Sequence, residues 1–183
     1  MILTKEDLQD ALNAGHIIVE PIAGDAIGTN SIDLHLSPYL ATYDQGTLDA
    51  KQPANIRRLE MTDEGYVLTP GTLYLASTLE YTETHRHIPI MHGKSSPARL
   101  GITVHQAAGF GDIGFCGHWT MEITVAKAVK VYPGLPIAQL CYIEPKSMPE
   151  EGYMQRKSST YTDARNPLPQ PSGLWRKFLQ PKS

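Results

Sequence analysis

The sequence predicts a mainly β protein, in which short strands form a barrel or sandwich after a single N-terminal helix. Glycine contributes 15 of the 183 residues and proline contributes 14, which suits many short strands joined by turns. Several segments alternate apolar and polar residues with the period of a strand, and the turn dipeptides Pro70-Gly71 and Pro133-Gly134 lie between such segments. A chain of 183 residues is long enough for one domain with its own core.

The first segment carries the signals of a helix. Thr4 suits the N-cap position, and Asp7 follows three residues later, close to a capping box. Three apolar residues then share one helical face: Leu8, Ala11 and Leu12. Because Gly15 is a typical helix stop, we expect the helix to end just before it.

The segments that follow are predicted as strands. They are residues 16–22, 31–36, 66–69, 72–76, 118–125, 129–131 and 137–143. Alternation is complete in residues 118–125, where Trp119, Met121, Ile123 and Val125 share one face and polar residues form the other. Residues 44–65 are polar and without a pattern, which predicts a long loop or an irregular insertion.

The C-terminal part of the chain differs in composition. From about Pro145 it is rich in proline, serine and lysine, and the prolines of residues 166–171 exclude a helix or a central strand there. We therefore expect one domain over residues 1–183, in which residues 145–183 form an arm or lid that is disordered or orders over a ligand or a neighbouring subunit.

Composition and charge exclude several classes of protein. The net charge of −3 does not indicate a nucleic-acid or membrane partner. Two cysteines cannot form a disulfide framework or a four-cysteine zinc site, and we interpret Cys116 and Cys141 as core thiols. Charged residues precede any apolar run at the N-terminus, and no stretch approaches the roughly 20 apolar residues of a membrane span. We expect a soluble, cytoplasmic protein.

The stretch of residues 93–101 is the first candidate site. Lys94 and Arg99 supply positive charge, and Ser95 and Ser96 supply hydroxyl donors, next to a glycine that allows close approach of a phosphate. The spacing is not that of a Walker A loop. The alternative is a turn before a short helix, in which Ser95 is the cap and Arg99 is solvated.

Two further candidates follow. In residues 107–117 four glycines surround Asp112, which indicates either a tight hairpin that contacts a flat ligand or an ordinary turn. Glu122 lies on the polar face of a predicted strand, either as a solvated side chain or as a general base and acid acting on water. His85 and His87 have no third metal ligand nearby, and the motif of zinc-dependent nucleobase deaminases is absent.

Together these segments resemble the dCTP deaminase family, within the superfamily of homotrimeric β-barrel deaminases and dUTPases. Nearly the whole chain takes part, most strongly residues 93–122. The segments that match are Ser31-Ile32-Asp33-Leu34-His35-Leu36, Gly93-Lys94-Ser95-Ser96, Arg99-Leu100-Gly101, Ala108-Gly109, Asp112-Ile113-Gly114-Phe115-Cys116-Gly117 and Met121-Glu122. The resemblance implies a dUTPase-like β-barrel, or distorted jelly roll, with few short helices and active sites between subunits.

The resemblance also implies a reaction and roles for residues. The family removes the 4-amino group of dCTP with water and without zinc, which supplies dUTP or dUMP for thymidylate synthesis. Glu122 is then the catalytic acid–base, assisted by Ser95 and Arg99. Implied substrate-binding residues are Lys94, Ser96, Ala108, Asp112, Thr120, Met121 and Tyr153. Asp112 binds the deoxyribose 3′-hydroxyl, and Mg²⁺ is held through the nucleotide phosphates.

Alternatives remain within the superfamily. The Gly109-Phe110 turn resembles that of bifunctional members, which form dUMP and pyrophosphate with Asp112 also serving the second step. A dUTP pyrophosphatase without deamination, a dCMP-preferring deaminase and a non-catalytic nucleotide-binding module stay open, as do inhibition by dTTP and a 5-substituted cytosine substrate.

The chain also departs from the family pattern. Lys94 replaces an arginine, and Gly111 replaces an isoleucine, which predicts a looser turn. The lysine and glutamine that usually approach the terminal phosphate align with Thr160 and Ala164. The departure in the tail indicates either a substrate with fewer phosphates or compensation by Lys157 or Arg165.

Overall fold

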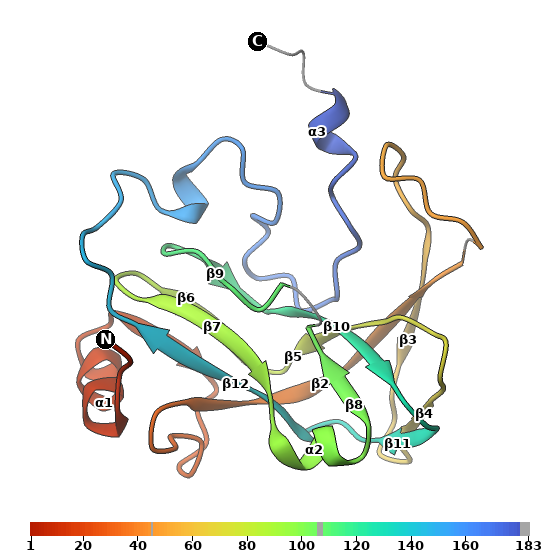
Figure 1. Cartoon of the computed structure of the whole chain (residues 1–183), viewed down its shortest axis with the longest axis horizontal. Coiled ribbons are helices and arrows are strands. Elements are labelled where there is room, and N and C mark those ends of the chain that lie inside the picture. The colour runs from red at the N-terminus through yellow and green to blue at the C-terminus, as the bar shows by residue number, and fades with distance from the viewer. Residues whose placement is uncertain (45, 106–107, 180–183) are drawn as a thin grey trace.

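The computed structural model describes residues 1–44, 46–105 and 108–179, and it shows a barrel of antiparallel strands with a long C-terminal segment (Figure 1). The helices are α1 (Lys5–Asn13), α2 (Ser95–Arg99) and α3 (Arg176–Leu179), with a 3₁₀ turn η1 (Tyr153–Gln155). The strands are β1 (Ile17–Glu20), β2 (Ile32–Tyr43), β3 (Ile56–Glu60), β4 (Tyr66–Leu68), β5 (Tyr74–Thr78), β6 (Tyr81–Thr84), β7 (Ile88–Gly93), β8 (Ile102–Val104), β9 (Cys116–Gly117), β10 (Thr120–Val125), β11 (Val129–Val131) and β12 (Pro136–Ile143). The predicted mainly β class is confirmed.

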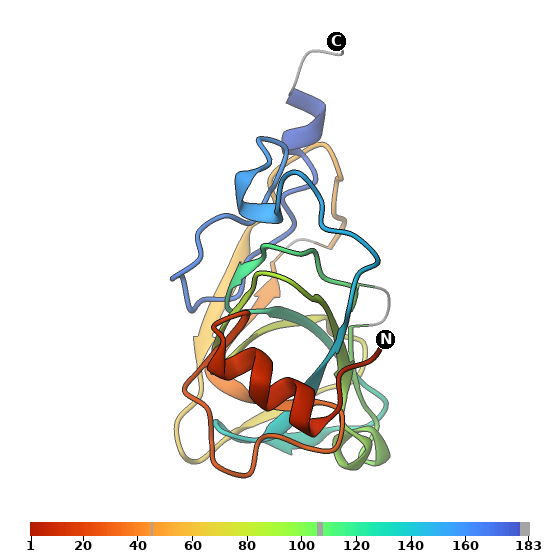
Figure 2. The same ribbon diagram turned by 90° about the vertical axis from the view of Figure 1, so that its left-hand side faces the viewer.

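The main sheet has the order β7-β12-β2-β5-β10-β8, and β3 pairs with the second half of β2. Within the described ranges two smaller sheets accompany it, in the orders β1-β6-β9 and β11-β4. The strands curve into a nearly closed barrel, and α1 lies across the end that faces the viewer in Figure 2. Strand β10 is therefore held on both sides, by β5 and by β8.

Helix α1 forms as predicted. The backbone N–H and the hydroxyl of Thr4 both donate to the Asp7 carboxylate, at 2.9 Å and 2.8 Å, and these bonds hold the first turn. Leu8 is fully buried, which contributes about 1.5–3 kcal/mol. The helix ends before Gly15, whose φ of 68° is one that glycine adopts without strain.

The alternation of β10 sorts its side chains into two environments. Met121 and Ile123 are fully buried in the core, and Trp119 and Val125 are 7% exposed. The residues between them, Thr120, Glu122 and Thr124, are half-buried on the other face. The period-2 pattern in the sequence therefore places the Glu122 carboxylate on a strand whose opposite face is packed in the core.

Residues 44–65 are not one long loop, because β3 forms within them. It pairs with β2 from Tyr39↔Glu60 to Tyr43↔Ile56. Arg57 and Arg58 are exposed, so backbone pairing on an edge creates this strand and no apolar alternation marks it. Residues 166–171 contain neither helix nor strand, as predicted.

The C-terminal segment follows β12 and lies against the barrel. The Ser77 hydroxyl donates to the Pro167 carbonyl at 2.6 Å, and the Gln170 N–H donates to the Thr120 hydroxyl at 3.0 Å. In both views this segment rises from one end of the molecule, whereas α2 lies at the opposite end (Figures 1 and 2). Among the described residues there is no helix with the length and apolar character of a membrane span.

Candidate active site

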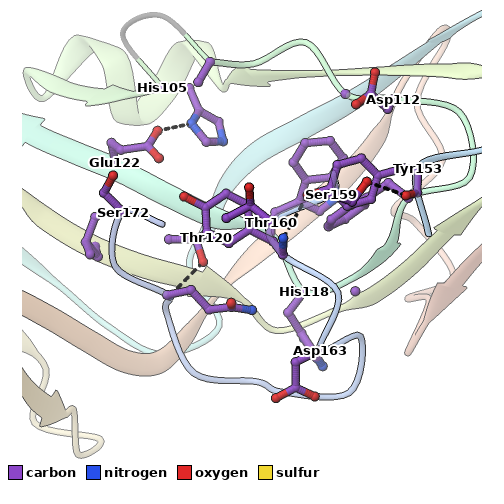
Figure 3. A pocket seen from close by; sticks show the side chains of 18 of the residues that line it. His105, Asp112, His118, Thr120, Glu122, Tyr153, Ser159, Thr160, Asp163 and Ser172 are labelled. Carbon is purple, nitrogen blue, oxygen red and sulfur yellow. Dashed lines mark hydrogen bonds and ion pairs between the residues drawn. The ribbon is translucent and has the colours of Figure 1, made fainter. Parts of the chain in front are cut away.

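A cavity of about 620 Å³ opens between β9, β10 and the C-terminal segment. Its volume is within the range of small-molecule sites, about 300–1,000 Å³. Of the ten residues that the sequence nominates, five line it: Ala108, Asp112, Thr120, Glu122 and Tyr153. Figure 3 shows Glu122 and Asp112 on opposite sides of this cavity.

Glu122 extends from the polar face of β10 into the cavity and is paired with His105. One carboxylate oxygen of Glu122 makes a short contact with Nδ1 of His105 (Figure 3), and the His105 N–H donates to the Glu122 carbonyl at 3.1 Å. The His105 side chain is 4% exposed, against 39% for Glu122, and Nε2 of His105 is buried with no hydrogen-bond partner among the described residues. A buried imidazole thus fixes the position of a carboxylate that ligands can reach.

His105 itself adopts an unusual backbone conformation. Its φ of 51° lies in the left-handed region, which non-glycine residues enter at a cost. This residue was not predicted from the sequence, because a histidine after a short strand has no distinctive pattern. Only the folded structure identifies His105, since the turn with the positive φ places its ring next to Glu122.

Asp112 lies across the cavity and is paired with Arg156. Nη2 of Arg156 is 2.7 Å from Oδ2 of Asp112, and both side chains are nearly half exposed. Tyr153 stacks edge-on against Phe115, with ring centroids 5.7 Å apart, and Arg156 lies 5.6 Å from the Tyr153 ring. The sequence nominated Asp112 and Tyr153 but not Arg156, which is 44 positions away from its carboxylate partner.

Thr120 and Met121 are neighbours on β10 but differ in what a ligand can contact. The Met121 side chain is fully buried, so only its backbone is available to a ligand. Among the described residues, β8 pairs with Ile123, Thr124 and Val125 and does not extend along the backbone edge of Thr120 and Met121. That edge carries donors and acceptors that match the edge of a flat heterocycle.

The turn before Asp112 is tighter than the sequence predicts. Ala107 lies outside the described residues, but a Cβ on Gly109 would be 2.3 Å from the Met91 carbonyl oxygen. A Cβ on Gly111 would be 2.5 Å from the Trp119 ring. The expectation that Gly111 loosens the turn is therefore wrong, since the glycine allows close packing against Trp119.

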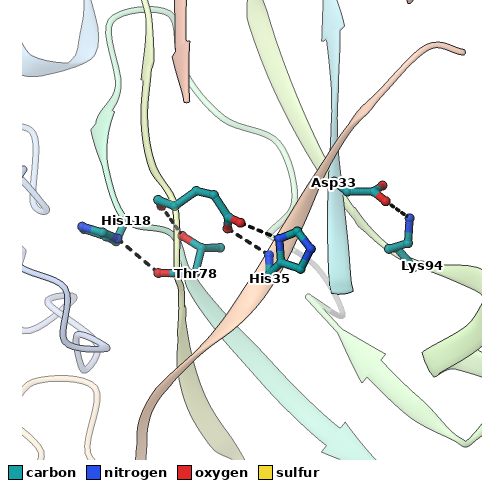
Figure 4. Close-up of polar contacts among 6 residues, drawn as sticks. Asp33, His35, Thr78, Lys94 and His118 are labelled. Atoms are coloured by element: carbon teal, nitrogen blue, oxygen red, sulfur yellow. Dashed lines mark hydrogen bonds and ion pairs between the residues drawn. The ribbon is translucent and has the colours of Figure 1, made fainter. Parts of the chain in front are cut away.

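The phosphate-binding candidates lie elsewhere in the chain. Ser95, Ser96 and Arg99 are exposed on α2, and none of them lines the cavity. Lys94 precedes α2 and forms an ion pair with Asp33 of β2 (Figure 4). Two residues further along β2, Nδ1 of His35 lies 2.6 Å from a carboxylate oxygen of the buried Glu80. The candidates Lys94, Ser95, Ser96 and Arg99 therefore lie apart from the candidates that line the cavity.

The candidates for compensation in the tail lie outside the cavity lining. Arg165 stacks 3.8 Å from the centroid of Tyr81, and neither Arg165 nor Lys157 lines the cavity. Near that stack, burial acts to raise the pKa of Glu83, but hydrogen bonds from Tyr81 and His85 outweigh it and hold the pKa below its ordinary value. Arg165 therefore anchors the tail to β6.

The cysteines and histidines of the described residues are not grouped as metal ligands. Cys116 and Cys141 are half-buried rather than fully buried, and burial raises the pKa of each thiol. Cys116 lines the cavity, so it is not simply a core residue. Across the part of the chain that the structure describes, no three His, Cys, Asp or Glu side chains are grouped to hold a metal ion.

The barrel and its cavity define the class of protein by fold. The chain superposes on the crystal structure of 2′-deoxycytidine 5′-triphosphate deaminase from Agrobacterium tumefaciens with a TM-score of 0.61, at 18% identity. The superposition covers 82% of this chain and 50% of that one, so this chain spans half the length of that protein. This likeness confirms the predicted β-barrel fold.

The family follows from the sequence. The family model described as dCTP deaminase-like matches residues 2–144, and the chain belongs to that family. A protein of Cytophaga hutchinsonii named dCTP deaminase, dUMP-forming, is 42% identical over 180 residues, covering 97% of this chain and 99% of the relative. A protein of the same name from Clostridium acetobutylicum is 39% identical, over 98% of this chain and 99% of its own length.

Proposed function

We propose that the protein hydrolyses dCTP to dUTP and ammonia, and then cleaves dUTP to dUMP and pyrophosphate. The observation that carries the proposal is Glu122, a carboxylate held by His105 on a rigid strand inside the cavity. Both relatives described above have names that combine dCTP deamination with dUMP formation. The Gly109-Phe110 turn supports the same two-step activity.

Glu122 is the acid–base of the deamination. Its carboxylate accepts a proton from water while the oxygen bonds to C4 of the cytosine ring, which gives a tetrahedral centre. The carboxyl group gives this proton to ring N3, which holds the electron pair of the opened C4=N3 bond. The carboxylate then moves the proton of the new hydroxyl group to the amino nitrogen, so that the C4=O bond forms as the C–N bond breaks and ammonia leaves. Ser95 and Arg99 hold and polarise the reacting region.

The cavity places the remaining parts of the nucleotide. The backbone edge of Thr120 and Met121 binds the pyrimidine, and Ala108 packs against sugar and base. Asp112 accepts a hydrogen bond from the 3′-hydroxyl and also serves pyrophosphate release. Tyr153 closes the side of the cavity next to Asp112, where its ring packs on Phe115.

The active form is a homotrimer. Ser95, Ser96 and Arg99 are exposed and Lys94 is half-buried, and all four lie outside the cavity of their own chain. Because a ring of subunits brings one surface of each chain to a different surface of the next, α2 reaches the cavity of a neighbouring subunit. Lys94, Ser95 and Ser96 then meet the phosphates, with Asp33 fixing the direction of Lys94.

The cavity fits Mg²⁺ that arrives with the nucleotide. Its lining includes the carboxylate of Asp163, and the described residues offer no cluster of three ligands that would hold the ion alone. Mg²⁺ typically binds phosphate oxygens with one or two carboxylates and keeps several waters. When bound, the ion neutralises part of the phosphate charge.

His105 is a positioning residue for Glu122. We expect His105→Ala to lower kcat about 10²-fold with little change in KM, because a carboxylate displaced by about 1 Å loses rate and not substrate contacts. His105→Asn should retain most of the rate, since asparagine tolerates the left-handed backbone and can donate from the position of Nδ1. Steady-state kinetics check both. Equal losses in the two variants would contradict this role.

A product assay tests the proposal as a whole. Purified protein with Mg²⁺ receives dCTP, dCMP or dUTP, and nucleotides, pyrophosphate and ammonia are quantified. We expect dUMP, pyrophosphate and ammonia from dCTP, and dUMP from dUTP. Accumulation of dUTP from dCTP would remove the second step. Reaction of dUTP alone, or of dCMP alone, would overturn the proposed substrate.

A further inference from the structure

Two cationic side chains line the cavity among the described residues, Arg156 and Lys177. The positions where the family resemblance expects a lysine and a glutamine near the terminal phosphate hold Thr160 and Ala164, which carry no charge. Lys177 is exposed on the four-residue helix α3. Arg156 is the cation that the fold positions firmly.

Backbone contacts hold Arg156 in place. The Tyr153 N–H donates to the Ile113 carbonyl at 2.7 Å, and the Arg156 N–H donates to the Tyr153 carbonyl at 3.3 Å. A Cβ on Gly114 would be 2.8 Å from the Cα of Gly152, so the two chain segments touch directly. The backbone of Arg156 is therefore fixed to the same turn that carries Asp112.

The partner of Arg156 is a carboxylate that the proposed reaction needs. Nη2 of Arg156 is 2.7 Å from Oδ2 of Asp112, and the side chains are 43% and 49% exposed. An ion pair this exposed contributes little to stability, so it can be exchanged at low cost. A guanidinium binds phosphate oxygens as a planar fork, and a polyphosphate carries more negative charge than one carboxylate.

From these contacts we infer that Arg156 recognises the phosphate chain and exchanges Asp112 for phosphate oxygens when a nucleoside triphosphate binds. The exchange releases the Asp112 carboxylate for the 3′-hydroxyl of the sugar. A monophosphate does not reach Arg156, so its sugar meets a carboxylate that is still paired. The inference rests on the proposed function and assigns the preference for a triphosphate to this ion pair.

Binding measurements test the inference apart from turnover. Full-length protein carrying Glu122→Gln is titrated calorimetrically with dCTP and with dCMP in the presence of Mg²⁺. Adding Arg156→Ala should weaken dCTP binding about 10-fold or more, the loss expected for a charge-assisted contact, and leave dCMP binding unchanged. Arg57→Ala is the matched control, because this arginine is exposed on β3, lies outside the cavity lining and should change neither affinity.

Two outcomes of this titration would overturn the inference alone. They are equal weakening of dCTP and dCMP, which would give Arg156 a merely structural role, and no change for either nucleotide. Failure of the Glu122→Gln protein itself to bind dCTP would overturn the proposed function together with the inference.

A second probe isolates the exchange. Inorganic tripolyphosphate has no sugar, so Asp112 acts on it only as a competitor for Arg156. We expect Asp112→Asn to tighten tripolyphosphate binding and the gain to vanish when Arg156→Ala is added. A gain that persists in the double variant would come from general charge reduction and would overturn the exchange.

Discussion

Glu122→Gln is expected to reduce ammonia release from dCTP by about 10²–10⁴-fold, the range lost when a general acid–base group is removed. Glutamine keeps the shape of the side chain and can still accept a hydrogen bond from His105, so the cavity and dCTP binding should persist. The measurement is single-turnover ammonia release with saturating dCTP, accompanied by calorimetric titration of dCTP.

The control variant is Glu64→Gln, which makes the same chemical change on an exposed loop between β3 and β4 and should leave the rate unchanged. The variant Glu122→Gln given dUTP separates the two steps, because our proposal assigns pyrophosphate release to Asp112. We expect dUMP still to form. Normal ammonia release by Glu122→Gln would remove Glu122 from the mechanism.

Local sequence rules predicted those parts of the fold that are set by side-chain alternation. The helix from Lys5 to Asn13 and the buried face of β10 follow from spacing alone. Strand β6 was not predicted, since Thr82 and Thr84 are buried polar residues that hide the alternation. Strand β3 was not predicted, because its pairing with β2 is made by backbone groups. Every residue has these groups, so they leave no pattern in the sequence.

The candidate site was predicted from the sequence only in part. Motif resemblance nominated Glu122 and Asp112, yet the partners of both are set by tertiary structure: His105 lies 17 positions before Glu122, and Arg156 lies 44 positions after Asp112. No local pattern relates such pairs. The sequence marks Lys94 only as a positive charge. The structure adds that its ion pair with Asp33 fixes the direction of that charge.

The assignment of α2 to a neighbouring subunit leads to the second large effect. Arg99→Ala should lower the rate about 10²–10³-fold, as loss of a polarising group does, without disturbing the barrel, since Arg99 is exposed on α2. Glu122→Gln is inactive for a different reason. If each site takes Glu122 from one chain and Arg99 from the next, the two defects fall on different chains and can complement each other.

Co-expression of the two variants with different tags, followed by two affinity steps, isolates mixed assemblies. In a mixed cyclic trimer one of the three junctions joins an intact Glu122 to an intact Arg99, so we expect about one third of wild-type activity. Differently tagged copies that both carry Glu122→Gln should remain inactive, which controls for the tags.

Inactive mixed assemblies would place Arg99 and Glu122 in the same chain. That arrangement would require α2 to leave the end of the barrel where it lies, opposite the C-terminal segment, and to break the hydrogen bond from the Lys94 N–H to the Ile137 carbonyl. Because the existing fold satisfies these contacts, complementation between chains is the outcome that requires no rearrangement of the barrel.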